Sequence, residues 1–325
     1  MIKRSNGQKT FGFGGKDNVI LTVCMSPCTD VTIELDSFNV GKTNVVKRKA
    51  LSFGGKGLNV AIGVKRLGAE CHTTGIMYNE NGYMFENALD RENVPFTFVW
   101  NKGRARENYK FIDRRAMLTE VNDVGEEVST EKTDEVLAMV RMLSARSNVA
   151  VLSGGLPRGI APSYYAELVK AVDDRCLKIV DASGARMFAA LDQGVDLVKP
   201  NIDELEDAIG KQIESKEDML AGCYQLIERG AKRVLLSLGK RGAVITDGRE
   251  NYFCKSLQVA VNSTVGAGDG MVAAAALQLE KGASLPEILR AGVAAGTATV
   301  MTVGQTSFTK EKYNEVLSTL QVKQI

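Results

Sequence analysis

The sequence predicts an α/β fold with a mostly parallel central sheet and a second, smaller β-sheet. Three observations lead to this prediction. Short runs rich in Val, Ile and Leu recur along the 325 residues, helical patterns separate several of them, and two polar, alternating stretches interrupt that order. Strands that alternate with helices are typical of a parallel sheet covered by helices.

Six apolar runs are predicted to form strands of the central sheet. Their nearly continuous apolar character is typical of strands buried on both faces. The runs are NVILTVC (18–24), VAVLSG (149–154), LKIVDAS (177–183), VDLVKPN (195–201), RVLLSLG (233–239) and GAVITDG (242–248). Between them, helical patterns cover residues 161–175 and 215–230, the second beginning with Ser215 before an acidic first turn and ending at Gly230.

Two stretches, residues 31–53 and 103–123, alternate between polar and apolar residues without an intervening long helix. They are predicted to pair with each other as one small antiparallel sheet. The pattern alone leaves two interpretations open, a lid over a pocket or an ordinary edge hairpin.

Composition excludes several classes of protein. Lys and Arg total 41 against 39 Asp and Glu, and no basic run suggests a nucleic-acid surface. No stretch reaches the ~18 to 20 apolar residues of a membrane span. Six scattered cysteines without a CxxC pair, and a single histidine, indicate reduced thiols rather than a metal site. We expect a cytoplasmic protein in which residues 1–17 form a flexible leader and residues 18–325 one domain.

The stretch VNSTVGAGDGMVAAAA (261–276) places Asp269 among three glycines at the start of an apolar helix. The first amide groups of a helix have no partner within the helix and favour a negative charge. Two interpretations are open. Asp269 accepts a proton from an attacking hydroxyl while the amides stabilise a transferred phosphoryl group, or it only caps the helix.

Other glycine-rich stretches do not complete known nucleotide-binding motifs. VGKT (40–43) lacks the earlier glycine of a P-loop, because Asp36 occupies that position. FGFGGKD (11–17) and GGKG (54–57) do not complete the dinucleotide-binding pattern, since Asp17 and Val60 replace its last glycine. A phosphate site of another kind is required.

Five motifs in a fixed order are more specific. They are GGKGLNVA (54–61), VLSGGLPRG (151–159), KPNIDE (199–204), SLG (237–239) and STVGAGD (263–269). Together they resemble the PfkB, or ribokinase-like, family of carbohydrate kinases over roughly residues 18–308. The resemblance implies a three-layer α/β/α fold with a β-sheet lid, formed by the segments at about 31–53 and 103–123, and the use of ATP and Mg²⁺.

The resemblance also implies roles for individual residues. Asp269 matches the catalytic base, and the backbone of Gly266, Ala267 and Gly268 matches the anion hole beside it. Four residues match the nucleotide site, where the first two organise Mg²⁺ through water: Asn201, Glu204, Ser237 and Gly239.

The acceptor sugar is expected between the first strand and the lid. The residues that match its hydroxyl contacts are Asp30, Gly54, Gly55 and Asn59. Lys42 and Arg106 match phosphate contacts in the phosphosugar branch of the family, and a guanidinium suits a phosphate because it donates two parallel hydrogen bonds. The family also implies a homodimer formed through the lid.

GGKGLNVA and NSTVGAGD are similar to the phosphosugar branch, which includes 1-phosphofructokinases and tagatose-6-phosphate kinases. We therefore expect ATP-dependent conversion of fructose 1-phosphate to fructose 1,6-bisphosphate. Tagatose 6-phosphate and fructose 6-phosphate are the alternative acceptors. A kinase of another sugar or of a nucleoside, and a sugar-phosphate sensor without catalysis, are more distant alternatives.

Three motifs depart from the family pattern. The branch reads N-P-A-x-D after the first strand, whereas this chain reads SPCTD from Ser26 to Asp30. Gly155 replaces the second serine of S-G-S-L-P, and Gly270 replaces the serine that usually follows GAGD. These departures leave the catalytic elements in place and weaken the assignment of the sugar.

Overall fold

The structure is a computed structural model that describes residues 19–115, 117–260, 264–302 and 307–325. The predicted leader, residues 1–17, lies outside the described residues. Among the residues that are described, no helix combines the length and the apolar character needed to cross a bilayer.

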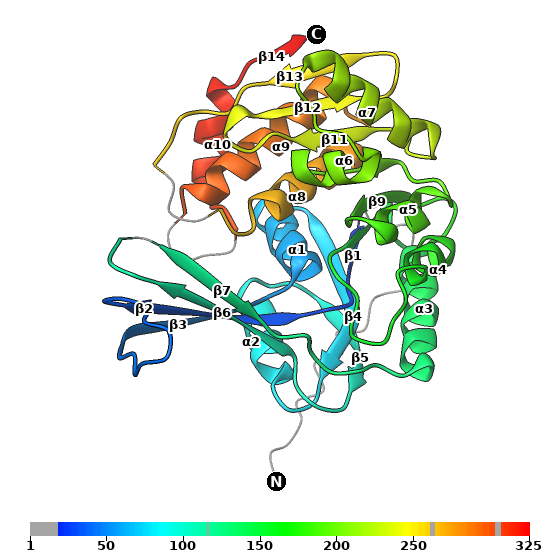
Figure 1. Ribbon diagram of the computed structural model, residues 1–325. Coiled ribbons are helices and arrows are strands. Elements are labelled where there is room, and N and C mark those ends of the chain that lie inside the picture. Colours follow the sequence, from blue (N-terminus) through cyan, green and yellow to red (C-terminus); the bar gives the residue numbers. More distant parts are fainter. Residues whose placement is uncertain (1–18, 116, 261–263, 303–306) are drawn as a thin grey trace.

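A ten-stranded sheet forms the centre of the molecule (Figure 1). Its strands run in the order β14 (Val322–Gln324), β13 (Asn251–Cys254), β12 (Ala243–Thr246), β11 (Val234–Ser237), β10 (Leu197–Val198), β9 (Leu177–Asp181), β8 (Val149–Ser153), β1 (Val19–Cys24), β4 (Glu70–Tyr78) and β5 (Phe96–Asn101). The pairs from β11 to β5 are parallel, and those from β11 to β14 are antiparallel. The predicted mostly parallel sheet is confirmed.

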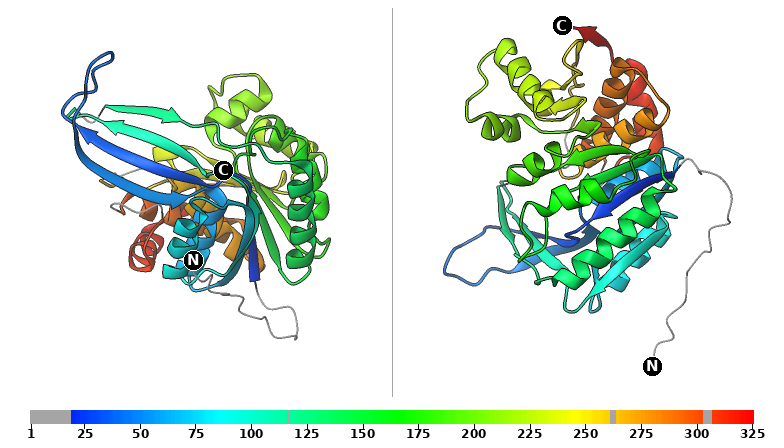
Figure 2. Two further views of the ribbon diagram at one scale, coloured as in Figure 1. Left: turned by 90° about the horizontal axis from the view of Figure 1, so that it is seen from below. Right: turned by 90° about the vertical axis from the view of Figure 1, so that its right-hand side faces the viewer.

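Helices cover both faces of this sheet, which gives the three-layer fold (Figures 1 and 2). One face carries α1 (Lys56–Arg66), α8 (Ala267–Glu280), α9 (Leu285–Val300) and α10 (Lys310–Thr319), and the other carries α3 (Thr130–Ser144), α4 (Tyr164–Ala171) and α5 (Ala185–Leu191). The remaining helices are α2 (Gly82–Arg91), α6 (Ile202–Ile209) and α7 (Lys216–Glu228).

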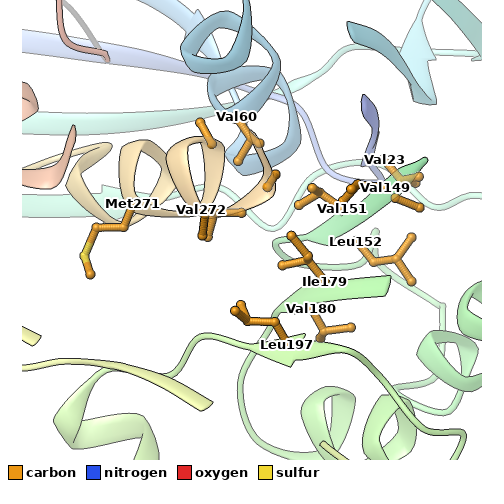
Figure 3. Close-up of a cluster of buried hydrophobic side chains, with 14 of the residues drawn as sticks. Val23, Val60, Val149, Val151, Leu152, Ile179, Val180, Leu197, Met271 and Val272 are labelled. Carbon is orange, nitrogen blue, oxygen red and sulfur yellow. The ribbon is translucent and has the colours of Figure 1, made fainter. Parts of the chain in front are cut away.

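The apolar runs of the strands form the core between these layers. Figure 3 shows Val60 of α1 and Val272 of α8 beside Val151 of β8 and Ile179 of β9, and all four side chains are fully buried. Strands such as β1, in which every residue is buried, need apolar side chains on both faces. This requirement explains the continuous apolar runs of the sequence.

A separate four-stranded sheet, called the small sheet below, projects from one side of the molecule (Figures 1 and 2). Its order is β3 (Val46–Gly54), β2 (Cys28–Leu35), β6 (Arg106–Ile112) and β7 (Leu118–Asn122). The two segments that interrupted the α/β pattern therefore do pair, as predicted. The central pair, β2 and β6, is parallel rather than antiparallel, because the two strands belong to different hairpins.

Candidate active site

A cavity of about 1320 Å³ lies where the carboxyl ends of the parallel strands meet the small sheet and the start of α8. Open α/β sheets bind ligands at this edge. Pockets for one small ligand measure ~300 to 1,000 Å³, so this cavity has room for two ligands together. The predicted site residues that line it are Asp30, Gly55, Asn59, Arg106, Asn201, Glu204, Ser237, Gly239, Gly266, Ala267, Gly268 and Asp269.

Asp269 lies in the first turn of α8 and lines the cavity, although its side chain is buried. The helix begins after Gly266, whose φ of 81° belongs to the left-handed region that favours glycine. Asn59 Nδ2 donates a hydrogen bond of 2.7 Å to Asp269 Oδ2. Burial, together with the negative charge of Asp181, raises the pKa of Asp269 to about 6. The carboxylate is therefore mostly ionised at neutral pH and basic enough to accept a proton.

Beside Asp269 lies a cluster of two lysines and one carboxylate, in which Asp181 and Lys199 are buried and Lys56 is partly exposed. Lys56, the first residue of α1, and Lys199, which follows β10, each place Nζ 3.2 Å from Asp181 Oδ1. Ser153 Oγ donates to the other carboxylate oxygen at 3.2 Å. Burial opposes ionisation of Asp181, but the two lysines outweigh it and lower its pKa to about 2. The cluster therefore carries one net positive charge next to the candidate base.

The sequence motifs GGKGLNVA and KPNIDE contain Lys56 and Lys199, but no role was predicted for either lysine. Asp181 was not predicted as a site residue. Their positions in the sequence could have indicated the site. Asp181 ends a buried strand, Lys199 follows one, and Lys56 begins a helix at the same edge of the sheet. Gly268 contributes to the arrangement. A Cβ at that position would lie 3.4 Å from Lys199 Nζ, which places the ammonium in van der Waals range of the start of α8.

The residues predicted to bind the nucleotide lie together at the start of α6. Asn201 and Glu204 form a capping box, in which Asn201 Oδ1 accepts from the Glu204 amide at 2.8 Å and Glu204 Oε2 accepts from the Asn201 amide at 2.9 Å. The Ser237 amide donates to Pro200 O at 3.0 Å, which places β11 beside this turn.

The donor set around Glu204 suits Mg²⁺ held largely by water and phosphate. Among the described residues, no group of three or more His, Cys, Asp or Glu side chains forms a metal cage. Glu204 uses Oε2 in the capping box, which leaves Oε1 for a metal-bound water. Mg²⁺ commonly binds through one or two carboxylates together with its own waters and the phosphates of a substrate. The residues present therefore fit the cation in that mode.

The base of the small sheet supplies polar side chains to the opposite part of the cavity. Asp30 Oδ2 lies 3.2 Å from Lys110 Nζ, and Asp30 Oδ1 accepts from Asn108 Nδ2 at 3.2 Å. Arg106 donates from Nε to Ser26 Oγ at 3.1 Å and from Nη1 to Asn108 Oδ1 at 2.8 Å. The parallel pairing of β2 with β6 brings these residues together, since Asp30 lies opposite Asn108.

Two residues expected at the sugar site do not line the cavity. Lys42 is exposed in the connection between β2 and β3. Gly54 faces Asn59 instead, because a Cβ there would lie 2.8 Å from Asn59 Oδ1. Asn59 lines the cavity as expected, but its amide is bonded to Asp269, which points to orientation of the carboxylate as well as contact with a sugar.

The structure explains one departure from the family pattern, Gly270, and shows the surroundings of Gly155 and Cys28. A Cβ at Gly270 would lie 2.7 Å from Thr299 Oγ1, so the threonine of α9 occupies the space of a side chain there. A Cβ at Gly155 would meet only Arg186 Nη1, at 3.6 Å. Cys28 lines the cavity, and burial together with the charge of Asp30 raises the pKa of its thiol to about 11. The thiol therefore stays protonated at neutral pH.

Comparison with known proteins places the chain among sugar kinases. Residues 22–312 match the family model described as pfkB family carbohydrate kinase. A 1-phosphofructokinase of Haemophilus influenzae is 30% identical over 272 residues, which cover 83% of this chain and 87% of that protein. A tagatose-6-phosphate kinase of Staphylococcus epidermidis is 28% identical over 311 residues, covering 94% and 100%.

Solved structures agree with the sequence comparison. Phosphofructokinase-2 of Escherichia coli, in complex with fructose-6-phosphate, superposes with a TM-score of 0.83 at 27% identity. The match covers 92% of this chain and 97% of that one. The large sheet, its helices and the small sheet therefore form the fold of these kinases.

Proposed function

The chain belongs to the pfkB family of carbohydrate kinases, and we propose that it transfers the γ-phosphoryl group of ATP to fructose 1-phosphate, with Asp269 as the base. Membership makes it a phosphotransferase that acts on a sugar hydroxyl. The relatives named 1-phosphofructokinase and tagatose-6-phosphate kinase support a sugar phosphate as the acceptor class. The product would be fructose 1,6-bisphosphate, formed at O6 of the acceptor.

The observation that carries this proposal is the buried carboxylate of Asp269 at the start of α8. In the proposed reaction, a carboxylate oxygen of Asp269 takes the proton of the sugar hydroxyl as its oxygen attacks the γ-phosphorus. The bond from that phosphorus to the bridging oxygen breaks, and ADP leaves with the electron pair. The amides of Gly266, Ala267 and Gly268 would donate to the phosphoryl oxygens during the transfer, which for Ala267 replaces a long contact of 3.4 Å to Thr264 O.

The charges around Asp269 support the same chemistry. Lys56 and Lys199 offset the negative charge that gathers on the phosphoryl oxygens, and Asp181 holds both ammonium groups in place. Mg²⁺, organised through water by Asn201 and Glu204, would neutralise the β- and γ-phosphates when it is bound. Ser237 and Gly239 would line the rest of the nucleotide site.

The small sheet is proposed to act as a lid over the acceptor. Asp30 would accept hydrogen bonds from sugar hydroxyls, and Gly55 and Asn59 would contact the sugar from α1. Arg106 would bind the phosphate that the sugar already carries. Closure of the sheet over the cavity excludes water, so that Asp269 activates the sugar hydroxyl rather than a solvent molecule.

We also propose a homodimer formed through the small sheet. Leu51 and Val121 are about half exposed, at 50% and 52%. They lie on one face with Val31 and Tyr109, because Val31 pairs with Leu51 and with Tyr109, and Tyr109 pairs with Val121. A second copy would cover this apolar face. Light scattering should give twice the chain mass, and Leu51→Lys with Val121→Lys should give the monomer.

An acceptor panel tests the proposed substrate. ADP release is measured with fructose 1-phosphate, tagatose 6-phosphate, fructose 6-phosphate, fructose and ribose. We expect the highest kcat/KM with fructose 1-phosphate. A higher value with either 6-phosphate would assign the chain to that acceptor, and the relatives named for those reactions make these the leading alternatives. Tight binding of a sugar phosphate without ADP release from any acceptor would favour a sensor.

A further inference from the structure

The basic side chains of the cavity differ in how far their charge is already compensated. Lys110 is paired with Asp30, and Lys56 shares Asp181 with Lys199. In the described part of the chain, five further cations of the same cavity have no carboxylate within ion-pair distance. Three of them, Lys240, Arg241 and Lys255, belong to the side of the cavity expected to bind the nucleotide, beside Gly239 and Gly242. The other two are Arg106 and Arg186, whose hydrogen bonds in the structure are to uncharged oxygens.

Arg186 is the less expected of the two. It lies in the first turn of α5, where the helix dipole favours negative charge. Its Nη2 donates to Ser183 Oγ at 3.2 Å, which fixes one edge of the guanidinium. The side chain is only partly buried, and it lines the cavity together with Ser183. Among the described residues, no carboxylate lies within ion-pair distance of its guanidinium.

Gly155 leaves the other edge of this guanidinium accessible. A Cβ at position 155 would have Arg186 Nη1, at 3.6 Å, as its only heavy-atom neighbour within 4 Å. The preceding glycine, Gly154, lies against the side chain of Lys56, with a Cβ position 3.4 Å from Lys56 Cβ. This stretch of backbone therefore connects the lysine cluster beside Asp269 to Arg186 along one wall of the cavity.

We propose that Arg186 binds the phosphate that the acceptor sugar already carries, opposite Arg106, and thereby determines specificity for a phosphorylated sugar. This inference rests on the proposed function. A guanidinium donates two parallel hydrogen bonds to a phosphate, and the absence of a side chain at Gly155 leaves room beside Nη1 of Arg186. A phosphate monoester carries about −1.5 to −2 charges at pH 7, which two uncompensated guanidinium groups match.

The experiment compares Arg186→Gln with the wild-type protein. The acceptor is the sugar phosphate that the wild-type protein uses best, tested beside the same sugar without its phosphate and beside ATP. Loss of a charged hydrogen-bonding partner should raise KM for the phosphorylated sugar roughly 10- to 100-fold. We expect KM for ATP and kcat/KM for the unphosphorylated sugar to stay within about twofold of wild type, because neither depends on that phosphate.

Two controls separate this role from a loss of folding or of general charge. Arg175→Gln removes an arginine paired with Asp173 outside the cavity, and it should leave all the constants unchanged. Inorganic phosphate should inhibit the wild-type enzyme competitively against the sugar phosphate, and Arg186→Gln should weaken that inhibition about as much as it raises KM. Thermal unfolding of Arg186→Gln should match wild type.

The outcomes are distinguishable. A raised KM for ATP with an unchanged KM for the sugar phosphate would place Arg186 at the nucleotide and overturn the inference, and so would unchanged constants throughout. Failure of the proposed function would appear earlier, as a wild-type protein with no preference for phosphorylated over unphosphorylated acceptors.

Discussion

Replacement of Asn59 by leucine should change the pH dependence of turnover through Asp269. Leucine has nearly the same shape as asparagine but donates no hydrogen bond. The side-chain amide of Asn59 donates to Asp269 Oδ2 at 2.7 Å, and the buried Asn59 Oδ1 has no hydrogen-bond partner among the described residues. The substitution therefore removes one donor to the carboxylate and one unsatisfied acceptor.

The size of the effect follows from the strength of that hydrogen bond. A hydrogen bond to a charged group contributes about 1.5 to 3 kcal/mol, and one pKa unit corresponds to about 1.4 kcal/mol. Because Asn59 donates to the ionised form, its loss should raise the pKa of Asp269 by roughly one to two units. Starting from a pKa of about 6, the ionised fraction at pH 7 would fall from roughly nine-tenths to between half and one-tenth.

The assay is ADP formation at saturating ATP and acceptor between pH 5.5 and 9.5, so that kcat reports the enzyme–substrate complex. We expect the acidic limb of kcat to move to higher pH in Asn59→Leu, with turnover recovering toward wild type at the alkaline end. Asn101→Leu, which removes an amide bonded to Glu127 O outside the cavity, is the matched control. A uniform loss of kcat at every pH, or an acidic limb that does not move, would refute the reasoning.

Two further predictions concern the packing around the same site. Gly270→Ala should destabilise the protein by about 1 to 3 kcal/mol in urea unfolding, because the added Cβ would lie 2.7 Å from Thr299 Oγ1. Adding Thr299→Ala should restore part of this loss, and a double variant whose loss of stability equals the sum of the two single losses would contradict the explanation. Asp181→Asn should cost on the order of 3 to 5 kcal/mol at pH 7, since it leaves the buried Lys199 without its carboxylate. Because the folded-state pKa of Asp181 is lowered from 3.8 to about 2, that cost should diminish as the pH falls through this range, and a cost that is independent of pH would rule out the ion pair as its cause.

Much of the fold could be predicted because burial leaves a pattern in the chain. A strand such as β1, buried along its whole length, is continuously apolar, and the half-exposed strands of the small sheet alternate. The parallel pairing of β2 with β6 could not be read from those patterns. It depends on which strands of two hairpins meet, and β2 and β6 are separated by the seventy residues between Leu35 and Arg106.

Site residues could be predicted from the sequence only where the residues that act together lie in one motif. Asp269 and its glycines are adjacent in sequence, so the helix start could be predicted from the chain. The Lys56–Asp181 contact joins residues 125 positions apart, and only the fold brings them together. Gly54 belongs to the same motif as Gly55, yet it does not line the cavity. The side chain of Asn59, in α1, fills the space next to Gly54.

Turnover of Asp269→Asn tests the central claim most directly. Asparagine keeps the size of the side chain and removes its ability to take a proton. We predict that kcat for ADP formation with the best acceptor falls by at least about 10²-fold, the low end of the usual contribution of a general base, while calorimetry shows ATP and the sugar phosphate still binding within a few-fold of wild type. Near-normal kcat in that variant would contradict the assignment of Asp269 as the base.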